Sequence, residues 1–222
     1  MDWKILHAHI QEGSTPQGLH LIRRSFVAMD NAHDGEFRDD GRPYRVHLTD
    51  SFTRAYDMGE RDPEVLATIL THDILESLKK LSKPMTVIEL GSQIGMSTAC
   101  RVSWMTKKKP MADPHTEYWL PMRGCKDHKT LKAKCYERQD NISTFKDMKA
   151  KPNESKETRI RRKLDETIRE FVPIVNWLLA DIEIRAFKNE KARNDERVLV
   201  NNIRRGFEYE LGKYGRKFET TK

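Results

Sequence analysis

DPEVLATILTHDILE, residues 62–76, gives the strongest indication of the fold. Asp62 and Pro63 supply an N-cap and a first-turn proline, so a helix is predicted to begin here and to run to about Leu81. Its apolar residues spread around nearly the whole circumference, which is typical of a helix surrounded by other helices. These residues are Val65, Leu66, Ile69, Leu70, Ile74, Leu75, Leu78 and Leu81. We therefore expect this helix at the centre of an all-α helical bundle.

Helices are also predicted over most of the rest of the chain. Apolar residues recur at spacings of three and four, and alternating β-branched runs are nearly absent, so almost no sheet is expected. The predicted helices lie at about Gly18–Ala32, Tyr44–Met58, within Ser82–Thr106, at Thr130–Phe145, from Ser155 onward with a kink or division at Pro173, and at Asp195–Gly212. Residues 107–129 should be mainly loop, where Tyr118 and Trp119 either cap a pocket or, as is more usual, pack onto the domain.

The composition indicates a folded protein with a positive surface. Its 222 residues are 37% hydrophobic and 34% charged, and 41 Lys and Arg against 34 Asp and Glu give a net charge of +7. Such a balance suits a globular chain that attracts anions. We expect one domain over residues 1–195, with the helix and basic tail of residues 196–222 in the same unit.

Cysteine usage and hydropathy indicate a cytoplasmic setting. Three cysteines without CxxC spacing suggest neither a disulfide framework nor a thiolate zinc site. The N-terminus lacks the pattern of a secretion signal, and no window approaches 18 apolar residues, so secretion and membrane spanning are not expected.

His72 and Asp73 stand in the middle of the predicted central helix. An imidazole beside a carboxylate is costly to bury unless the pair meets a partner or a cation. An isolated pair of this kind is more often a satisfied core feature. Glu76 follows one helical turn later, so the three side chains can converge on one sector of the helix and form part of a metal site.

Two other segments carry suitable ligands. His47 ends the PYRVH segment. Glu137 of CYERQDN is followed by Asp140, Asn141 and Thr144 at spacings of three, four and seven, on one helix face. Taken alone, that face is more often merely solvated. If it met His72, the mixed nitrogen and oxygen ligands would suit Mn²⁺, Fe²⁺ or Zn²⁺ better than Ca²⁺. Such an ion activates water for hydrolysis of a phosphate ester.

Four ordered motifs resemble the Rel/Spo-type alarmone hydrolases, HD-domain enzymes that use Mn²⁺ to remove the 3′-pyrophosphate of guanosine tetra- and pentaphosphate. AHDGEFRDDGRPYRVH, residues 32–47, resembles their opening loop and first histidine ligand, and residues 62–76 resemble their central helix. KCYERQDNISTF, residues 134–145, resembles their last metal-ligand helix, and RKLDETIREFVPIVNWL, residues 162–178, the helix after it. The resemblance covers about residues 20–190, the hydrolase half of the long bifunctional enzymes.

This resemblance implies roles for individual residues. His47, His72, Asp73 and Glu137 would bind Mn²⁺ or another divalent transition metal, and Glu76 and Ser77 would be the catalytic positions. Glu137 replaces the family's aspartate, with Asp140 as a substitute ligand. Ser77 replaces a second acid beside Glu76, which predicts low or redirected activity, because general-base steps carry factors of roughly 10² to 10⁴.

The resemblance also implies a purine nucleotide pocket. Its substrate-binding residues would be Arg38, Tyr44, Lys134, Arg138, Asn141 and Thr144. Arg38 would stack on the purine base, and Asn141 and Thr144 would contact the sugar and phosphates. Lys134 and Arg138 would strengthen the anionic pocket.

Several functions are compatible with these features. The leading hypothesis is an alarmone pyrophosphohydrolase acting on a guanine or adenine compound, and a rival is an HD phosphohydrolase of another nucleotide such as a deoxynucleotide. A nucleic-acid-binding protein is less expected, because no binding motif accompanies the basic clusters at Lys107–Lys109, Arg159–Lys163 and Arg204–Arg205. Ser77 keeps open an HD domain that binds a nucleotide or partner without hydrolysis. No membrane partner is expected, and the oligomeric state stays open.

Overall fold

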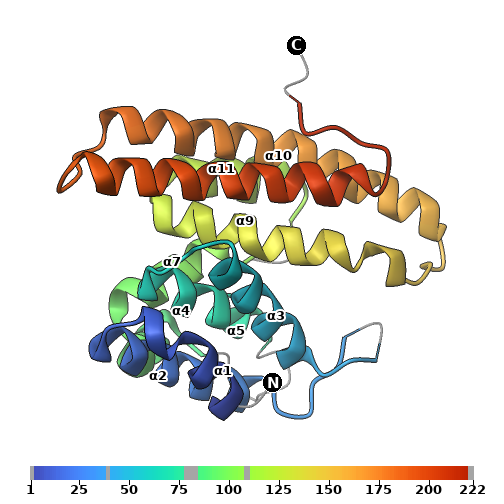
Figure 1. Cartoon of the computed structure of the whole chain (residues 1–222). Helices are drawn as coiled ribbons and strands as arrows, with labels where there is room; N and C mark the ends of the chain where they lie inside the picture. The colour runs from blue at the N-terminus through green and yellow to red at the C-terminus, as the bar shows by residue number, and fades with distance from the viewer. Residues whose placement is uncertain (1–2, 39–40, 78–84, 108–110, 220–222) are drawn as a thin grey trace. The chain divides into compact units, whose positions relative to one another are not determined.

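The computed structural model describes residues 3–38, 41–77, 85–107 and 111–219, and these are helical apart from turns, loops and two isolated β-bridges (Figure 1). The all-α prediction is confirmed. The chain divides into two compact units, an N-terminal unit Met1–Lys134 and a C-terminal unit Cys135–Lys222. The single domain over residues 1–195 stays a prediction, and residue 195 itself lies inside a helix.

Short helices build the N-terminal unit. They are α1 Trp3–Ile10, α2 Pro16–Ala32, α3 Tyr44–Asp57, α4 Pro63–Thr71, α5 Ile74–Ser77, α6 Val87–Ile94, α7 Met96–Met105, α8 Leu120–Gly124, and the start of α9 His128–Ser143. Local capping sets several of their ends. The Thr15 hydroxyl accepts the Gly18 N–H at the start of α2, and the Asp62 carboxylate accepts the Glu64 N–H at 2.9 Å at the start of α4. The predicted start at Asp62 and Pro63 is therefore confirmed.

Helix α4 forms the centre of this unit, as predicted. Every residue from Val65 to Thr71 is buried, and the helix packs against α2, α3 and α7. Its two buried threonines donate to carbonyls one turn back, Thr68 to Glu64 and Thr71 to Ala67, so the apolar surroundings leave neither hydroxyl unsatisfied. The apolar residues that the sequence places around the whole circumference of α4 are therefore buried on all sides of the helix.

Several predicted helices differ from the observed ones. The central helix is not continuous to Leu81, because a turn at His72 and Asp73 separates α4 from α5, and residues 78–84 lie outside the described ranges. The helix expected within residues 82–106 is divided into α6 and α7 at Gly95, whose φ of +90° is a conformation that suits glycine.

Three more segments depart from expectation. Residues 107–129 were expected to be mainly loop, yet they include a π-helical turn, His115–Trp119, followed by α8. Pro173 does not divide its helix, since α10 runs without interruption from Lys156 to Ile184. Helix α1 was not predicted, because its eight residues carry no capping signal.

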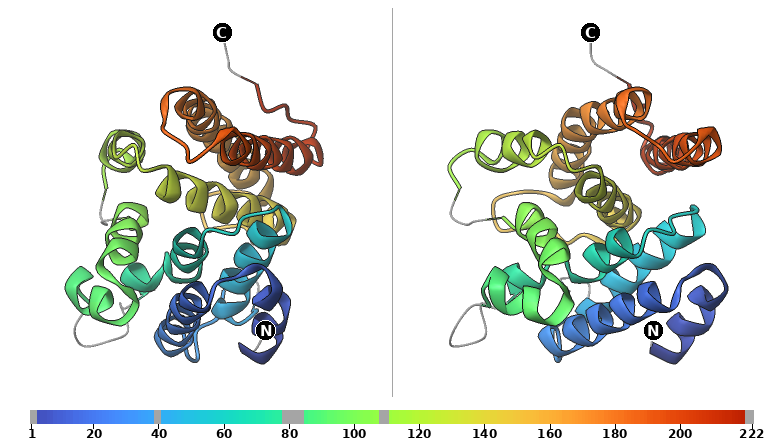
Figure 2. Two further views of the ribbon diagram at one scale, coloured as in Figure 1. Left: turned by 60° about the vertical axis from the view of Figure 1, so that its left-hand side comes forward. Right: turned by 90° about the vertical axis from the view of Figure 1, so that its left-hand side faces the viewer.

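The C-terminal unit contains the rest of α9 and two long helices, α10 Lys156–Ile184 and α11 Glu190–Gly212. Ser155 and Asn189 cap the two long helices, which lie side by side in Figure 2. Phe171 of α10 and Phe207 of α11 meet with ring centroids 5.4 Å apart, so the apolar faces of the pair form a core. Among the described residues, no helix has the length and apolar content needed to cross a bilayer.

Candidate metal centre

The loop before α3 places His47 in the interior of the N-terminal unit. Phe37 and Pro43 form an isolated bridge, and the Tyr44 N–H donates to the Glu36 carbonyl at 2.8 Å, so the loop closes on itself where α3 begins. His47 follows in the first turn of α3 and is 4% exposed. Its ring lies edge-on to that of His72, with centroids 5.5 Å apart.

His72 lies in the turn between α4 and α5, and a hydrogen bond defines the tautomer of its ring. His72 Nδ1 lies 2.8 Å from the Ile69 carbonyl oxygen. Because a carbonyl oxygen only accepts, Nδ1 carries the hydrogen, and a neutral ring then presents a lone pair at Nε2. In an uninterrupted helix the Ile69 carbonyl would accept the Asp73 N–H, so the histidine side chain competes with the backbone at the point where the helix stops.

His72 Nε2 lies 3.3 Å from Asp73 Oδ2. A nitrogen lone pair and a carboxylate oxygen repel at this distance unless a proton or another cation lies near both atoms. One ligand atom from each of His47, His72 and Asp73 lies within 4.8 Å of the others. Donors around a single ion at about 2.1 Å are separated by at most about 4.2 Å, so a small adjustment would let all three bind one ion.

The electrostatics keep Asp73 ionised. Burial opposes the charge on this carboxylate, but His72, His47 and the Tyr44 hydroxyl together hold its pKa well below the usual range. The Tyr44 hydroxyl donates to Asp73 Oδ2 at 2.5 Å. Burial and the neighbouring Asp73 charge raise the pKa of Tyr44 far above its usual value, so the phenol stays protonated and remains a donor.

His33 packs against Tyr44 beside the cluster, and the sequence analysis did not identify it. Its ring stacks on Tyr44 with centroids 4.7 Å apart and planes 9° apart, and its Nδ1 lies 2.7 Å from Glu36 Oε2. Burial lowers the pKa of His33, despite the opposing effect of Glu36 and Asp73. The only sequence signal for this role is the presence of His33 and Tyr44 at the two ends of one loop.

The candidate catalytic residues lie on α5. Glu76 Oε1 accepts the Lys107 N–H at 2.6 Å, which joins α5 to the segment after α7. The helix stops at His72 and Asp73, so these residues and Glu76 do not lie on one continuous helix. Their convergence stays a prediction. The catalytic role of Glu76 stays a prediction. Ser77 ends α5, and its side chain lies outside the described part of the structure.

Two predicted substrate residues belong to the N-terminal unit besides Tyr44. Arg38 is half-buried in the loop before α3, and its charge counteracts the rise in the pKa of Tyr44. Lys134 Nζ lies 5.5 Å from the Tyr118 ring centroid, and Lys107 Nζ lies 5.2 Å from the same ring. Tyr118 and Trp119 are buried, so they pack onto the protein, the more usual of the two expected arrangements.

The other predicted residues lie on α9, or just after it, in the C-terminal unit. Glu137 accepts a hydrogen bond from the Asn141 side-chain amide. Thr144 follows the last turn of α9 and donates to the Asn141 carbonyl at 3.0 Å. Arg138 Nε donates to Thr167 Oγ1 of α10 at 2.8 Å. The assigned roles of Glu137 as fourth ligand, with Asp140 as its substitute, and of Arg138, Asn141 and Thr144 in substrate binding stay predictions.

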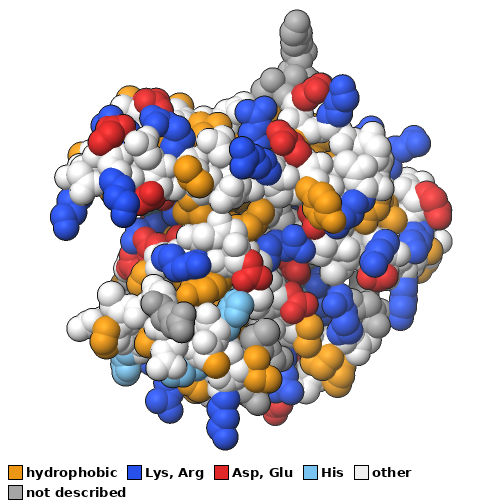
Figure 3. All heavy atoms as spheres, viewed as in Figure 1, with side chains coloured by type: hydrophobic (Ala, Val, Ile, Leu, Met, Phe, Trp, Pro, Cys, Tyr) orange, Lys and Arg blue, Asp and Glu red, His pale blue; other side chains and the backbone are white. Residues whose placement is uncertain are grey.

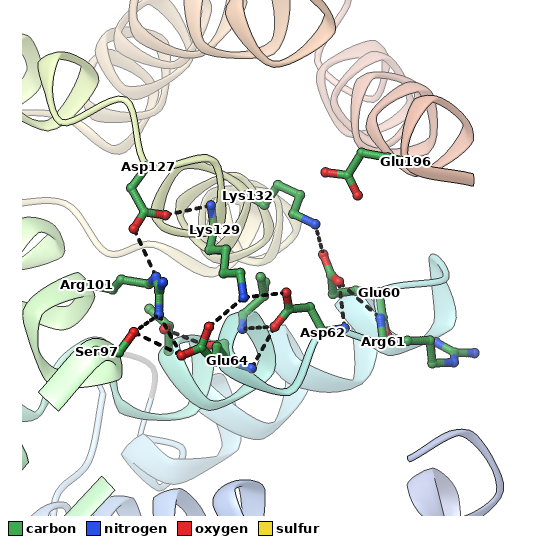
Figure 4. Close-up of polar contacts among 12 residues, drawn as sticks. Glu60, Arg61, Asp62, Glu64, Ser97, Arg101, Asp127, Lys129, Lys132 and Glu196 are labelled. Atoms are coloured by element: carbon green, nitrogen blue, oxygen red, sulfur yellow. Dashed lines mark hydrogen bonds and ion pairs between the residues drawn. The ribbon is translucent and has the colours of Figure 1, made fainter. Parts of the chain in front are cut away.

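An ion-pair network that the sequence reasoning missed joins the start of α4 to the start of α9 (Figure 4). Lys129 Nζ lies 2.9 Å from Asp62 Oδ2 and 2.5 Å from Glu64 Oε2. Arg101 of α7 contacts Glu64 at 3.3 Å and Asp127 at 3.1 Å. The network contacts the N-terminal end of α4, whereas His72 lies at the C-terminal end. It therefore helps to hold in place the helix that carries His72.

The basic clusters have acidic neighbours. In the cluster at residues 159–163, Arg162 contacts Glu154 at 2.8 Å and Lys163 contacts Glu166 at 3.0 Å. Arg204 contacts Glu208 at 3.0 Å. Figure 3 shows positive and negative side chains intermixed over α11. Lys108 and Lys109 lie outside the described residues. Several of the basic side chains in these clusters therefore form ion pairs with acidic side chains on the protein surface.

The chain shows a distant similarity to a known hydrolase. No family model matches the chain. Over 173 residues the chain is 25% identical to the guanosine-3′,5′-bis(diphosphate) 3′-pyrophosphohydrolase of Vibrio cholerae serotype O1, and the match covers 76% of this chain. The chain spans about a quarter of that relative's length, since the match covers 23% of it. A cluster of two buried histidines and a half-buried aspartate thus occurs in a chain distantly related to a Rel/Spo-type HD hydrolase.

Proposed function

We propose that this protein is a metal-dependent phosphohydrolase that removes the 3′-pyrophosphate from a guanosine or adenosine tetra- or pentaphosphate. The observation that carries the proposal is the approach of His72 Nε2 to Asp73 Oδ2 at 3.3 Å, with His47 in the same cluster. The distant relative, whose name states this activity, supports the choice of substrate. The three cysteines, which form no disulfide in the described structure, are compatible with a cytoplasmic site of action.

The residues in the cluster would hold the ion. His47 and His72 offer nitrogen ligands, Asp73 offers an ionised carboxylate, and Glu137 is the proposed fourth ligand. Two imidazoles with carboxylates suit Mn²⁺ or another divalent transition metal. When bound, such an ion would polarise a phosphoryl oxygen and lower the pKa of a water molecule.

The other residues would act on the substrate and on protons. The Lys107 N–H fixes one oxygen of Glu76, so the orientation of this carboxylate is set, and we propose Glu76 as the acceptor of the proton from the attacking water. Arg38 is the proposed contact to the purine. Lys134 would add positive charge for the phosphates, with Asn141 and Thr144 as further contacts.

Pyrophosphate release tests the proposal. Protein freed of metal by a chelator should release pyrophosphate from guanosine tetraphosphate, or from its adenosine counterpart, only after Mn²⁺ is added. His72→Ala and Asp73→Ala should reduce the rate to background, whereas His20→Ala, on the exposed face of α2, should leave it unchanged.

Other outcomes would contradict the proposal. Turnover of Asp73→Ala at the parent rate would rule out the site. Phosphate release from deoxynucleotides alone would identify a different phosphohydrolase. Saturable nucleotide binding without product would identify a binding protein, the outcome that Ser77 in place of a second acid leaves open.

A further inference from the structure

Tyr44 lies between the loop that precedes α3 and the cluster of His47, His72 and Asp73. It is the first residue of α3, where its N–H donates to the Glu36 carbonyl at 2.8 Å. Its hydroxyl reaches across 29 positions of sequence to Asp73 Oδ2 at 2.5 Å. The phenol thus connects the start of α3 with the turn between α4 and α5, which carry the three candidate ligands.

The hydrogen bond has only one direction. An ionised carboxylate accepts and cannot donate, so the phenol O–H must be the donor. Hydrogen bonds to a charged acceptor are stronger than neutral ones. A tyrosine phenol is protonated at neutral pH, so this donor is present under ordinary conditions.

Asp73 needs such a donor because of where it lies. The torsion that rotates a carboxylate about its last bond has broad, shallow minima, so the two oxygens interchange easily unless a partner holds them. Asp73 lies in the turn between α4 and α5, outside the regular part of either helix. Its oxygen Oδ2 faces both Tyr44 and His72, at 2.5 Å and 3.3 Å.

Tyr44 is itself held in place. The His33 ring lies flat against the Tyr44 ring at 4.7 Å, and His33 Nδ1 lies 2.7 Å from Glu36 Oε2. Glu36 therefore contacts both partners, His33 through its carboxylate and the Tyr44 backbone through its carbonyl. The phenol has little freedom to turn away from Asp73.

We propose that Tyr44 is a positioning residue that holds the Asp73 carboxylate for a divalent cation, and that His33 keeps the phenol in position. This inference rests on the proposed metal-dependent function, and it gives Tyr44 a role different from the substrate contact expected from the family resemblance. Loss of a partner that orients a metal ligand typically lowers metal affinity by about 10- to 100-fold. Removal of the Tyr44 hydroxyl alone should have an effect of that size.

Metal affinity can be measured without turnover. Metal-free protein would be titrated with Mn²⁺ and with Zn²⁺ in competition with a chelating dye. The four proteins compared are the parent, Tyr44→Phe, Tyr56→Phe and Asp73→Asn. Tyr56 is the matched control, because it lies on the same helix and its hydroxyl donates to a backbone carbonyl, that of Ile10 at 3.5 Å. We expect affinity to fall about 10- to 100-fold in Tyr44→Phe and to stay unchanged in Tyr56→Phe.

A double variant separates positioning from a general loss of structure. If Tyr44 acts through Asp73, Tyr44→Phe should lower affinity little further once Asp73→Asn is present, whereas independent effects would add. Absence of metal binding by the parent protein would overturn the proposed function. Parent-like affinity in Tyr44→Phe, with affinity lost in Asp73→Asn, would overturn the positioning role and leave the metal site intact. A full further drop in the double variant would also contradict that role.

Discussion

Replacement of Lys129 by methionine should destabilise the N-terminal unit in a way that depends on pH. Lys129 Nζ contacts Asp62 at 2.9 Å and Glu64 at 2.5 Å, and its side chain is only 23% exposed. Methionine keeps the apolar stem and removes the charge. Ion pairs at protein surfaces contribute about 0.2–1 kcal/mol each, so the loss of two pairs should cost about 0.4–2 kcal/mol near neutral pH.

The pH range of this effect follows from the pKa shifts of Glu64, Asp62 and Lys129. Burial alone would raise the pKa of Glu64, but Lys129, Ser97 and Arg101 lower it from 4.5 to about 2. The pKa of Asp62 is also lowered, again against the effect of burial. Stabilisation by these carboxylates is therefore fully present above their ordinary pKa values and is lost as the pH falls toward 2.

The alkaline limit has the opposite sign. Burial disfavours the charged form of Lys129, but Asp62 and Glu64 raise its pKa above 10.5. Its contribution is present below 10.5 and is lost as the pH rises through the folded-state value. The difference in free energy of unfolding between the parent and Lys129→Met should therefore be largest between about pH 5 and pH 10.

Urea denaturation followed by circular dichroism at pH 7 and pH 3 would measure this difference. Lys4→Met, at an exposed position on α1, serves as the control and should change stability little at either pH. The cost of Lys129→Met should be smaller at pH 3 than at pH 7. An equal cost at both values would refute the assignment of the effect to these carboxylates, and no cost at pH 7 would refute the network as a source of stability.

Two further substitutions test the packing and the backbone of the N-terminal unit. Leu66 is 0% exposed at the centre of α4, so Leu66→Ala should lower the free energy of unfolding by about 2–5 kcal/mol in urea, and a cost under about 1 kcal/mol would contradict its core position. Gly95 has φ of +90° and open space where a Cβ would lie, so Gly95→Ala should cost about 1–3 kcal/mol from backbone strain alone. Thermal unfolding would measure it, and a neutral result would show that the turn between α6 and α7 takes another conformation.

Part of the candidate site could be predicted because its signals are local. His72 and Asp73 are neighbours in the chain, and an adjacent imidazole and carboxylate in an apolar helix indicate a cation or a partner whatever the rest of the fold does. His47 was identified from its motif. Its approach to His72 is a long-range contact between α3 and the end of α4, and only the folded chain shows the edge-on rings 5.5 Å apart.

Other features of the site left no sequence signal. The hydroxyl of Tyr44 contacts Asp73 across 29 residues, and Lys129 contacts Glu64 across 65. A side chain of either type has many potential partners at such separations, and spacing does not select among them. Glu76 illustrates the same point, because its spacing from His72 gives no indication that its carboxylate accepts the backbone N–H of Lys107, 31 residues later.

The sequence alone determined the helical class, the start of α4 at Asp62 and Pro63, and the burial of α4 on every side. These follow from capping and from apolar periodicity, which act within one or two helical turns. The end of the helix at His72 and Asp73 is seen only in the folded structure, because the apolar pattern continues through Ile74 and Leu75 without a glycine or proline. Two contacts are made at this turn, the His72 ring on the Ile69 carbonyl and the Tyr44 hydroxyl on Asp73. The second comes from another segment of the chain, so helical periodicity cannot indicate it.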